Sequence, residues 1–405
     1  MKKKIMNKFF LKKKSNIKIF DLGKHPFADT FIAKKDLKKK EPIYPLRCVL
    51  DKESGCIFNE VITSDKKRYN LYDYSYTSSN SNYSKSYWKE YADQFKKKYY
   101  YRGKILEVGC NDGYLLQHLN KKGFETYGCD ASKFISNLSK DKKIKVMNYI
   151  FDFKNSKKIK KKIGKVDYII ANNVVNHSNN PNDFVKGVKN LLNDDGYFIF
   201  EQPYWLDMMK TSRIDQIYHE HITYFTLKFS KWLLKRNGMF LHDYEITHYH
   251  GGSLRIIAKK NIEFNNENEK KINKGINKEV KFGLFDRNIY QNINTKLQNK
   301  KKSLYKKINY YKKKDYKIIG IGAAAKANTF LCYFGLNNKI VDFITDASKF
   351  KIGKSTPKTR IPIYADEKLK RINVKIVAII LSWNISNILK KKLKKLNKDL
   401  KFIDL

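Results

Sequence analysis

Glu107-Val108-Gly109-Cys110-Asn111-Asp112-Gly113 is the stretch of sequence that decides the fold. It follows a short apolar run, and the residues after it have the spacing of a helix that begins near Tyr114. Glycines in such a stretch let the backbone turn sharply and approach a bound molecule closely. The first amides of the helix point at a negatively charged group of that molecule. The stretch therefore predicts a strand, a ligand-binding turn and a helix, the repeating unit of a parallel α/β sheet.

The alternation of apolar runs and helical segments continues to about residue 260. A helix over 229–236, a stop at Gly238 and strands at 239–246 and 253–259 complete this region. Five strand-helix units followed by a helix and two strands is the order of the seven-stranded sheet of class I methyltransferases. The five earlier strands are expected at 104–108, 125–129, 144–148, 166–171 and 197–201.

Two polar positions support a nucleoside-type cofactor at this sheet. Asp130 ends the second strand, where a carboxylate accepts hydrogen bonds from both ribose hydroxyls, and Asn172 ends the fourth strand at the edge where ligands bind. A glycine-rich turn alone also fits a dinucleotide enzyme. Turn, acid and strand order together predict S-adenosylmethionine as the cofactor. The expected binding residues are Glu107, Gly109, Asn111, Gly113, Asp130 and Asn172.

With 405 residues the chain is too long for one core, and four parts are expected. The last part has strands at 316–321, 339–344, 374–381 and 401–404, with a turn from Gly320 to Lys326. This turn resembles a phosphate-binding loop, with Gly322 allowing close approach and Lys326 supplying charge, although glycine packing alone also explains it. Both α/β parts open with strand, glycine and helix, but no internal repeat is evident by eye. The parts are an N-terminal lobe with a Tyr- and Ser-rich tract (1–90), a cofactor domain (91–260), a helical connector (261–312) and a Rossmann-like domain (313–405).

The chain is strongly basic, with 85 Lys and Arg against 39 Asp and Glu and a net charge of +46. The excess is mostly Lys, is spread along the whole chain and accompanies many Asn, Ile and Tyr residues, as AT-rich codons produce. A nucleic-acid footprint instead clusters on one face with Arg at reading positions. We therefore expect a solvated basic surface, anionic small substrates and no nucleic-acid partner.

The five cysteines have no CxxC spacing, so neither a disulfide framework nor a four-thiolate zinc site is indicated. No apolar run approaches the ~18 residues of a membrane span, and the apolar piece at 9–11 is too short for a signal peptide. The sequence predicts a cytoplasmic protein with no membrane partner, as a monomer or homodimer.

The segment Ile217-Tyr218-His219-Glu220-His221-Ile222-Thr223-Tyr224-Phe225 concentrates titratable groups after the fifth strand. Because it emerges at the carboxyl end of the sheet, it is suited to proton abstraction beside the cofactor. Metal ligation by the two histidines is an alternative, although HEH is not the HExxH spacing of metalloproteases. A polar structural corner is a second alternative. Spacing does not decide which histidine faces the cofactor, and His177 near the edge is a competing base.

Six pieces together resemble the sugar-nucleotide C-methyltransferases, over nearly the whole chain. YHEH and GGSLR in this order are more specific than the cofactor turn. The pieces are Tyr74-Ser75-Tyr76-Thr77-Ser78-Ser79, Glu107 to Gly113, Asn172-Asn173-Val174 with His177, Tyr218-His219-Glu220-His221, Gly251-Gly252-Ser253-Leu254-Arg255, and Gly320 to Lys326.

The resemblance implies methylation of a carbon of a nucleoside-diphosphate keto-deoxysugar, as in deoxysugar and polysaccharide biosynthesis. It implies that His221 removes the proton next to the carbonyl, with Glu220, Tyr218 and Tyr76 assisting. Methylation of an oxygen or nitrogen of a sugar nucleotide is an alternative, and a basic RNA methyltransferase is a further one. The expected substrate contacts are Tyr74, His177, Arg255, Gly322 and Lys326.

One departure from the family concerns zinc. Members typically carry four zinc-binding cysteines in the N-terminal lobe, whereas Asp51 and Ser54 stand here roughly where a cysteine pair belongs. Cys48 and Cys56 alone do not complete a tetrahedral site. No structural zinc and no other metal is expected.

Overall fold

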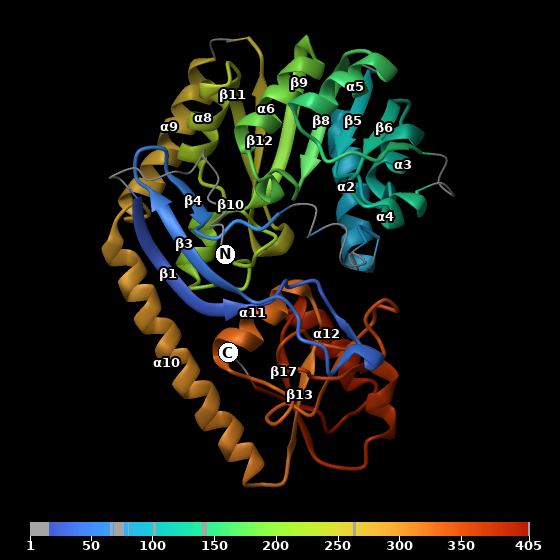
Figure 1. The fold of residues 1–405 in the computed structure, drawn as a ribbon, viewed down its shortest axis with the longest axis vertical. Helices are drawn as coiled ribbons and strands as arrows, with labels where there is room; N and C mark the ends of the chain where they lie inside the picture. Colours follow the sequence, from blue (N-terminus) through green and yellow to red (C-terminus); the bar gives the residue numbers. More distant parts are fainter. Residues whose placement is uncertain are drawn as a thin grey trace. The chain divides into compact units, whose positions relative to one another are not determined.

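The computed structural model describes residues 16–64, 68, 77–79, 81–99, 103–139, 144–261 and 265–403. The chain forms two compact units, and each contains its own sheet with a set of parallel strands (Figure 1). Unit 1 comprises Met1–Ile17, Val49–Met208 and His221–Asp286, and unit 2 comprises Lys18–Cys48, Met209–Glu220 and Arg287–Leu405.

Unit 1 is built on a seven-stranded sheet with the order β11-β12-β9-β8-β5-β6-β7. Strands β5 to β9 are parallel, and β12 joins β9 and β11 by antiparallel pairing. This is the strand order of class I methyltransferases, so the predicted fold is confirmed. The strands are β5 (Lys104–Val108), β6 (Glu125–Cys129), β7 (Lys145–Met147), β8 (Val166–Asn172), β9 (Leu192–Pro203), β11 (Phe240–Thr247) and β12 (Ser253–Lys259).

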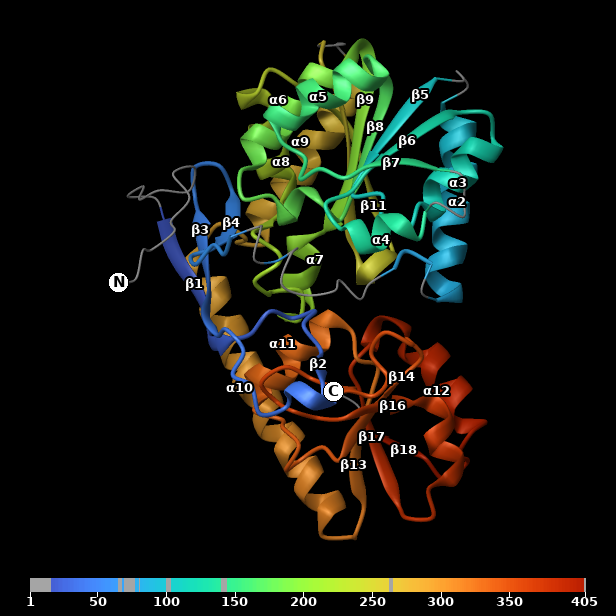
Figure 2. The same ribbon diagram turned by 45° about the vertical axis from the view of Figure 1, so that its right-hand side comes forward.

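One face of this sheet is covered by α2 (Asn82–Lys98) and α3 (Tyr114–Lys121) (Figure 2). Helix α2 begins at Ser81, whose side chain accepts a hydrogen bond from the Ser84 amide. Its aromatic face, which includes Trp88 and Phe95, is buried in the same cluster as the strand residues of unit 1. The boundary expected at residue 90 therefore falls inside a helix that belongs to the core of unit 1.

The opposite face carries α5, α6 and α8, and α9 packs against α8 and β11 (Figure 2). Asp152, Asn180 and Thr226 each accept a hydrogen bond from the third residue after them, which fixes the starts of these three helices. The remaining helices of this region are α4 (Lys133–Asn137), α5 (Phe153–Ile163), α6 (Pro181–Leu191), α7 (Trp205–Lys210), α8 (Leu227–Arg236) and α9 (Asn266–Lys281).

The N-terminal strands contribute to both units. In unit 1, β4 (Cys56–Asn59) pairs antiparallel with β10 (Thr223–Tyr224), which places Phe58 opposite Thr223. In unit 2, β2 (Ile32–Ala33) pairs antiparallel with β15 (Lys354–Ser355). The other two strands here are β1 (Asn16–His25) and β3 (Tyr44–Asp51).

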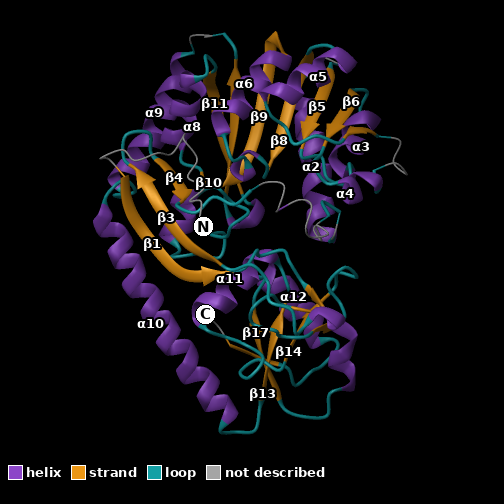
Figure 3. Cartoon of the chain, viewed as in Figure 1, coloured by secondary structure: helices purple, strands orange, loops and turns teal. Residues whose placement is uncertain are grey.

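Unit 2 has a five-stranded parallel sheet with the order β16-β14-β13-β17-β18 (Figure 3). Apolar residues of α10 and α11 pack on one face, and α12 packs on the other. The strand expected at 339–344 instead lies at Phe343–Asp346, because the amides of Ile340 and Val341 bond back to Asn337 in a turn. The elements are β13 (Lys317–Ile321), β14 (Phe343–Asp346), β16 (Ile363–Ala365), β17 (Ile376–Ile380), β18 (Lys401–Ile403), α10 (Arg287–Lys312), α11 (Ala325–Phe334) and α12 (Ser386–Lys394).

None of the helices in the described parts of the chain has the length and apolar character that a membrane span needs. In the segment expected to be a helical connector, α9 belongs to unit 1 and α10 to unit 2.

Candidate active site

The turn after β5 requires glycine for two separate reasons. Gly109 has φ of 70°, and a Cβ there would lie 2.0 Å from Cγ2 of Val174. Gly113 has φ of 72° and directly precedes α3. The Gly109 amide donates to the Cys129 carbonyl at 2.7 Å, which holds the turn against the end of β6. Backbone amides are thereby brought to the carboxyl edge of the sheet, as the sequence predicts.

Asp130 organises this edge through two backbone hydrogen bonds. Its Oδ2 accepts from the Asn111 amide at 2.9 Å, and its Oδ1 accepts from the Ser132 amide at 2.8 Å. Burial raises the pKa of Asp130, and these two bonds oppose that effect. Asn111 has φ of 53°, a left-handed conformation that Asn tolerates better than most residues. Each carboxylate oxygen keeps a lone pair for a ligand hydroxyl.

Glu107 supplies a second acidic group at the same turn. Its side chain is buried, and burial together with Asp112 and Asp130 raises its pKa well above the ordinary value. Its Oε2 has no hydrogen-bond partner within the described ranges, so an acceptor is open beneath the turn. Carboxylates for ribose hydroxyls and for a positively charged amino group are the set that S-adenosylmethionine requires. The residues present fit that cofactor.

Asn172 ends the adjacent strand β8, as predicted, and its neighbour Asn173 has φ of 54°. The Asn173 amide donates to the Glu201 carbonyl at 2.7 Å, so the chain turns sharply just beyond the strand. The predicted cofactor residues are therefore gathered at the carboxyl ends of three neighbouring strands, β6, β5 and β8.

The end of the Tyr- and Ser-rich tract contacts the cofactor turn. The Ser78 amide donates to Oδ1 of Asn111 at 2.8 Å, and the Ser79 hydroxyl donates to Asp112. Tyr74 and Tyr76 lie outside the described residues.

His221 lies in unit 1 beside His177, which follows β8. Their rings are 4.9 Å apart and nearly perpendicular. Burial, His221 and Arg68 all lower the pKa of His177 well below its ordinary value, so His177 is neutral at neutral pH. His221 itself is buried. The structure thus brings together the two residues that the sequence left as competing bases.

The backbone around His221 is held on both sides. Asn59 Nδ2 donates to the His221 carbonyl at 2.7 Å, and the Asn59 amide donates to the Ile222 carbonyl at 2.9 Å. The Ile222 amide donates to the Asn176 carbonyl at 2.7 Å. Sequence reasoning missed Asn59, because its partner is 162 residues away and no local pattern connects them.

The other members of the YHEH segment belong to unit 2, and the segment is a turn rather than an extended strand. His219 is fully buried against the rings of Tyr44 and Phe27, and its Nε2 lies 3.2 Å from the Tyr44 carbonyl. Glu220 Oε1 accepts from the Asp29 amide at 3.1 Å. Burial and neighbouring carboxylates, Glu220 first, raise the pKa of Tyr218 well above its ordinary value. The two histidines therefore have different surroundings, and those of His219 are structural.

Metal ligation finds no support in the part of the chain that the structure describes, where no group of three His, Cys, Asp or Glu side chains is placed to hold an ion. The expected absence of zinc stays a prediction.

The contacts of Arg255 favour a structural role over the expected substrate contact. Its guanidinium pairs with Glu201 at 2.9 Å and Glu245 at 3.1 Å, donates to the Tyr87 hydroxyl at 3.0 Å and lies 4.3 Å from the Tyr91 ring centroid. Through these partners Arg255 joins α2 to three strands of the sheet. The guanidinium donors that a ligand would need are therefore already used.

Gly322 lies in the turn after β13 in unit 2, and Lys326 is the second residue of α11, which follows that turn. Gly322 has φ of 87°, and a Cβ there would lie 2.2 Å from the Ser382 hydroxyl. Lys326 is buried, and its Nζ donates to Asn384 Oδ1 at 2.5 Å beside the Trp383 ring. Arg213 stacks on that ring at 4.1 Å, and the Trp383 indole donates to Asp215 at 2.5 Å.

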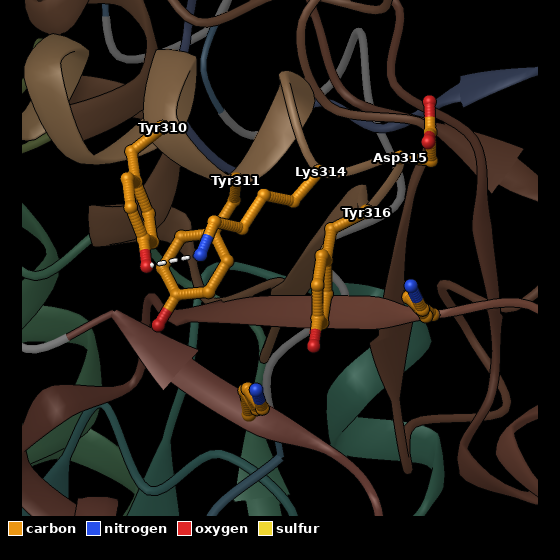
Figure 4. Close-up of a pocket in the computed structure, with 7 residues that line it drawn as sticks. Tyr310, Tyr311, Lys314, Asp315 and Tyr316 are labelled. Carbon is orange, nitrogen blue, oxygen red and sulfur yellow. Dashed lines mark hydrogen bonds between the residues drawn. The ribbon is translucent and has the colours of Figure 1, made fainter.

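A hollow of about 360 Å³ lies at the amino-terminal edge of the same sheet (Figure 4). Three tyrosines (Tyr310, Tyr311 and Tyr316) and three lysines contribute to it, and Lys314 donates to the Tyr310 hydroxyl at 2.7 Å. Ligands of parallel α/β sheets bind at the carboxyl edge, so we do not assign this hollow to the active site.

Comparison with known proteins agrees with this geometry. Residues 82–242 match a methyltransferase domain, and residues 248–404 match the C-methyltransferase C-terminal domain. The chain thus contains a methyltransferase domain followed by a C-methyltransferase C-terminal domain. C-methyltransferase NovU of Streptomyces niveus is 24% identical over 280 residues, which are 69% of this chain and 66% of NovU. The match thus covers slightly less than two thirds of that relative.

Solved structures with partial similarity include two from different organisms. Magnesium protoporphyrin IX methyltransferase of Synechocystis is 14% identical, with a TM-score of 0.36 over 44% of this chain and 83% of its own. The PH0226 protein of Pyrococcus horikoshii is 16% identical, with a TM-score of 0.36 over 49% of this chain and 99% of its own.

Proposed function

We propose that this protein is an S-adenosylmethionine-dependent C-methyltransferase that acts on a nucleoside-diphosphate keto-deoxysugar. The observation that carries the proposal is the position of His221, whose backbone is fixed by Asn59 and Asn176 in the unit that contains the cofactor turn. A carbon is methylated only after its proton is removed, and that step needs a positioned base. Methylation of a hydroxyl or an amine depends less on a positioned base.

In this proposal Asp130 and Glu107 hold the cofactor, which supplies an electrophilic methyl group. His221 removes the proton from the carbon next to the carbonyl. The neutral His177 ring beside it adds no positive charge that would oppose protonation of His221. Tyr218, which stays protonated, is a donor suited to the developing enolate oxygen, with Glu220 and Tyr76 as further assistants. Tyr74, Gly322 and Lys326 remain proposed substrate contacts.

The test is turnover of keto-sugar nucleotides, followed by release of S-adenosylhomocysteine and by mass fragmentation of the product. His221→Ala should lose turnover by about 10²-fold or more and keep its affinity for S-adenosylhomocysteine. His219→Ala is the matched control. Because His219 is structural, this variant should have a lower melting temperature, which separates a structural histidine from a base. If His221→Ala still exchanges the substrate's α-proton with solvent at the wild-type rate, another group is the base.

A further inference from the structure

Glu201 and Gln202 are neighbours at the carboxyl end of β9, yet their side chains have different surroundings. Glu201 accepts from the Tyr87 hydroxyl at 2.8 Å and pairs with Arg255 at 2.9 Å, so it faces α2. Because successive side chains of a strand point to opposite faces, Gln202 faces away from α2. Gln202 is fully buried, and neither its Oε1 nor its Nε2 has a hydrogen-bond partner within the described ranges.

Two further polar atoms of this kind lie on segments that pack near the end of β9. Oδ1 of Asn176 and Oγ1 of Thr223 are buried, and they too have no partner among the residues that the structure describes. Asn176 belongs to the 3₁₀ helix Val175–His177, which packs against both β9 and β10. A bridge between Tyr204 and Phe225 joins the chain just beyond β9 to the chain just beyond β10, the strand that contains Thr223. The three side chains are therefore gathered in one part of unit 1.

This part of unit 1 also contains the proposed base. Asn176 directly precedes His177 in the chain, and Thr223 follows His221 by two residues. The Ile222 amide donates to the Asn176 carbonyl at 2.7 Å, so a backbone hydrogen bond connects the two histidine segments.

Gln202 is equally close to the cofactor edge of the sheet. Asn172, a predicted cofactor residue at the end of β8, pairs with Glu201 in the register of β8 and β9. Gln202 is the next residue along β9, so it lies between the strand that ends in Asn172 and the segment that contains the proposed base.

Buried polar atoms without partners make a folded protein less stable, and native proteins keep few of them. Proteins tolerate such a cost at positions that serve function, because a bound molecule then supplies the missing hydrogen bonds. The four atoms of Gln202, Asn176 and Thr223 thus indicate a binding site for a polar group.

The chemistry of these atoms selects the ligand. The Gln202 carboxamide and the Thr223 hydroxyl can each donate and accept, and Oδ1 of Asn176 accepts. A ligand hydroxyl also donates and accepts, so it matches this set. None of the three side chains carries a charge, so they suit a neutral sugar ring better than a phosphate.

We propose that Gln202, together with Asn176 and Thr223, binds a hydroxyl group of the acceptor sugar and thereby determines which sugars are methylated. The inference rests on the proposed function, because it names the part of that substrate that these side chains recognise. A site built to bind a hydroxyl rejects the analogue that lacks it, because its own polar atoms then stay unpaired. In this role Gln202 sets specificity and takes no part in removing the proton.

The first measurement is the stability of the full chain by scanning calorimetry. Gln202→Met replaces the carboxamide with an unbranched apolar side chain and should raise the melting temperature, because two unpaired polar atoms are removed. Asn237→Leu is the matched control. Asn237 is a buried amide of the same unit, but its Nδ2 donates to Asn182 and to the Leu233 carbonyl, both at 2.8 Å, so this variant should have a lower melting temperature.

The second measurement is binding by titration calorimetry in the presence of S-adenosylhomocysteine. The probes are 4-keto-6-deoxyhexoses linked to UDP, dTDP, GDP or CDP, each compared with its 2-deoxy and 3-deoxy counterparts. The wild type should bind one hydroxyl-bearing probe at least about tenfold more tightly than a deoxy counterpart, and Gln202→Met should lose this preference. Both proteins should bind S-adenosylhomocysteine equally well.

Three results overturn the inference: a melting temperature of Gln202→Met that falls as in the control, no difference in wild-type affinity between the hydroxyl-bearing probes and their deoxy counterparts, or a preference that Gln202→Met retains. Failure of the proposed reaction looks different. In that case no sugar nucleotide is methylated, yet the preference for the hydroxyl in binding still depends on Gln202.

Discussion

Asn59 illustrates how one buried amide positions a reactive side chain. Besides its two bonds to the backbone at His221 and Ile222, its Oδ1 accepts from the Tyr224 hydroxyl at 3.2 Å. The residue is almost fully buried, so all three groups depend on it rather than on water. The carbonyl of His221 is thereby fixed from β4, a strand that precedes the cofactor domain in the sequence.

We predict that Asn59→Asp lowers kcat by about 10-fold to 10²-fold, because the bond to the His221 carbonyl loses its donor and a small displacement of a base is costly. Affinity for S-adenosylhomocysteine should stay within twofold, since the hydrogen bonds of Asn59 described above go to the segment from His221 to Tyr224. Steady-state kinetics and calorimetry measure the two quantities. Tyr224→Phe is the control, because it removes the Asn59 contact that does not involve His221. Equal losses of kcat in both variants would mean that Asn59 only stabilises the fold.

Helix α8 follows directly after the His221 segment, and an acid from another helix holds its start. Glu279 of α9 accepts from the amides of Leu227 at 2.5 Å and Lys228 at 3.0 Å, and from the Tyr204 hydroxyl at 2.9 Å. Its side chain is fully buried, and burial raises its pKa to about 7 against the effect of these bonds. Helix α8, which follows the proposed base in the chain, is therefore held at its start by the titrating carboxyl group of Glu279.

We predict that Glu279 makes the protein less stable as pH rises from 4.5 to 7. In this range the folded state keeps a proton that the unfolded chain has lost, so the free energy of unfolding decreases with pH. Urea unfolding of Glu279→Gln across the range should show a smaller decrease. Glu269→Gln, an exposed acid on the same helix, is the control and should follow the wild type. Parallel curves for wild type and Glu279→Gln would contradict the assignment.

The sequence predicted the elements of this fold wherever the pattern was local. Strands 104–108, 125–129 and 253–259 match the structure at both ends. The spacing of the aromatic residues in α2 was present at 87, 88, 91 and 95, but the Tyr- and Ser-rich tract before them was assigned to the N-terminal lobe up to residue 90. Local reasoning also missed the repeat of Asp-Ala-Ser-Lys-Phe at 130–134 and 346–350, since it is seen only when two segments far apart in the chain are compared.

In the candidate site, too, some features follow from local sequence and others do not. Glu107, Gly109 and Asp130 were predictable because a turn and its spaced acid form one continuous unit. The choice between His219 and His221 was not, since it depends on Tyr44 and Asn176, which come from remote segments. Long-range packing supplies this kind of information, and a single sequence does not contain it.

At the scale of the whole molecule the dominant feature is the net charge of +46. Exposed pairs such as Lys98 with Glu245 contribute little individually, so they do not offset this excess. Several helices carry many lysines, and on α10 Lys302 and Lys306 are exposed one turn apart. Like charges at this spacing repel, and compaction of the chain brings many more of them together.

We therefore predict that salt stabilises the folded protein. Raising NaCl from about 10 to about 150 mM shortens the screening length to about 8 Å and should raise the melting temperature by a few degrees. Lys302→Glu should raise the melting temperature at low salt, because it converts a repulsive pair into an attractive one, and this advantage should shrink as salt increases. Scanning calorimetry at each salt concentration measures both effects. A melting temperature that falls with added NaCl would mean that attractive ion pairs outweigh the repulsion, and the basic surface would then be part of what holds the fold together.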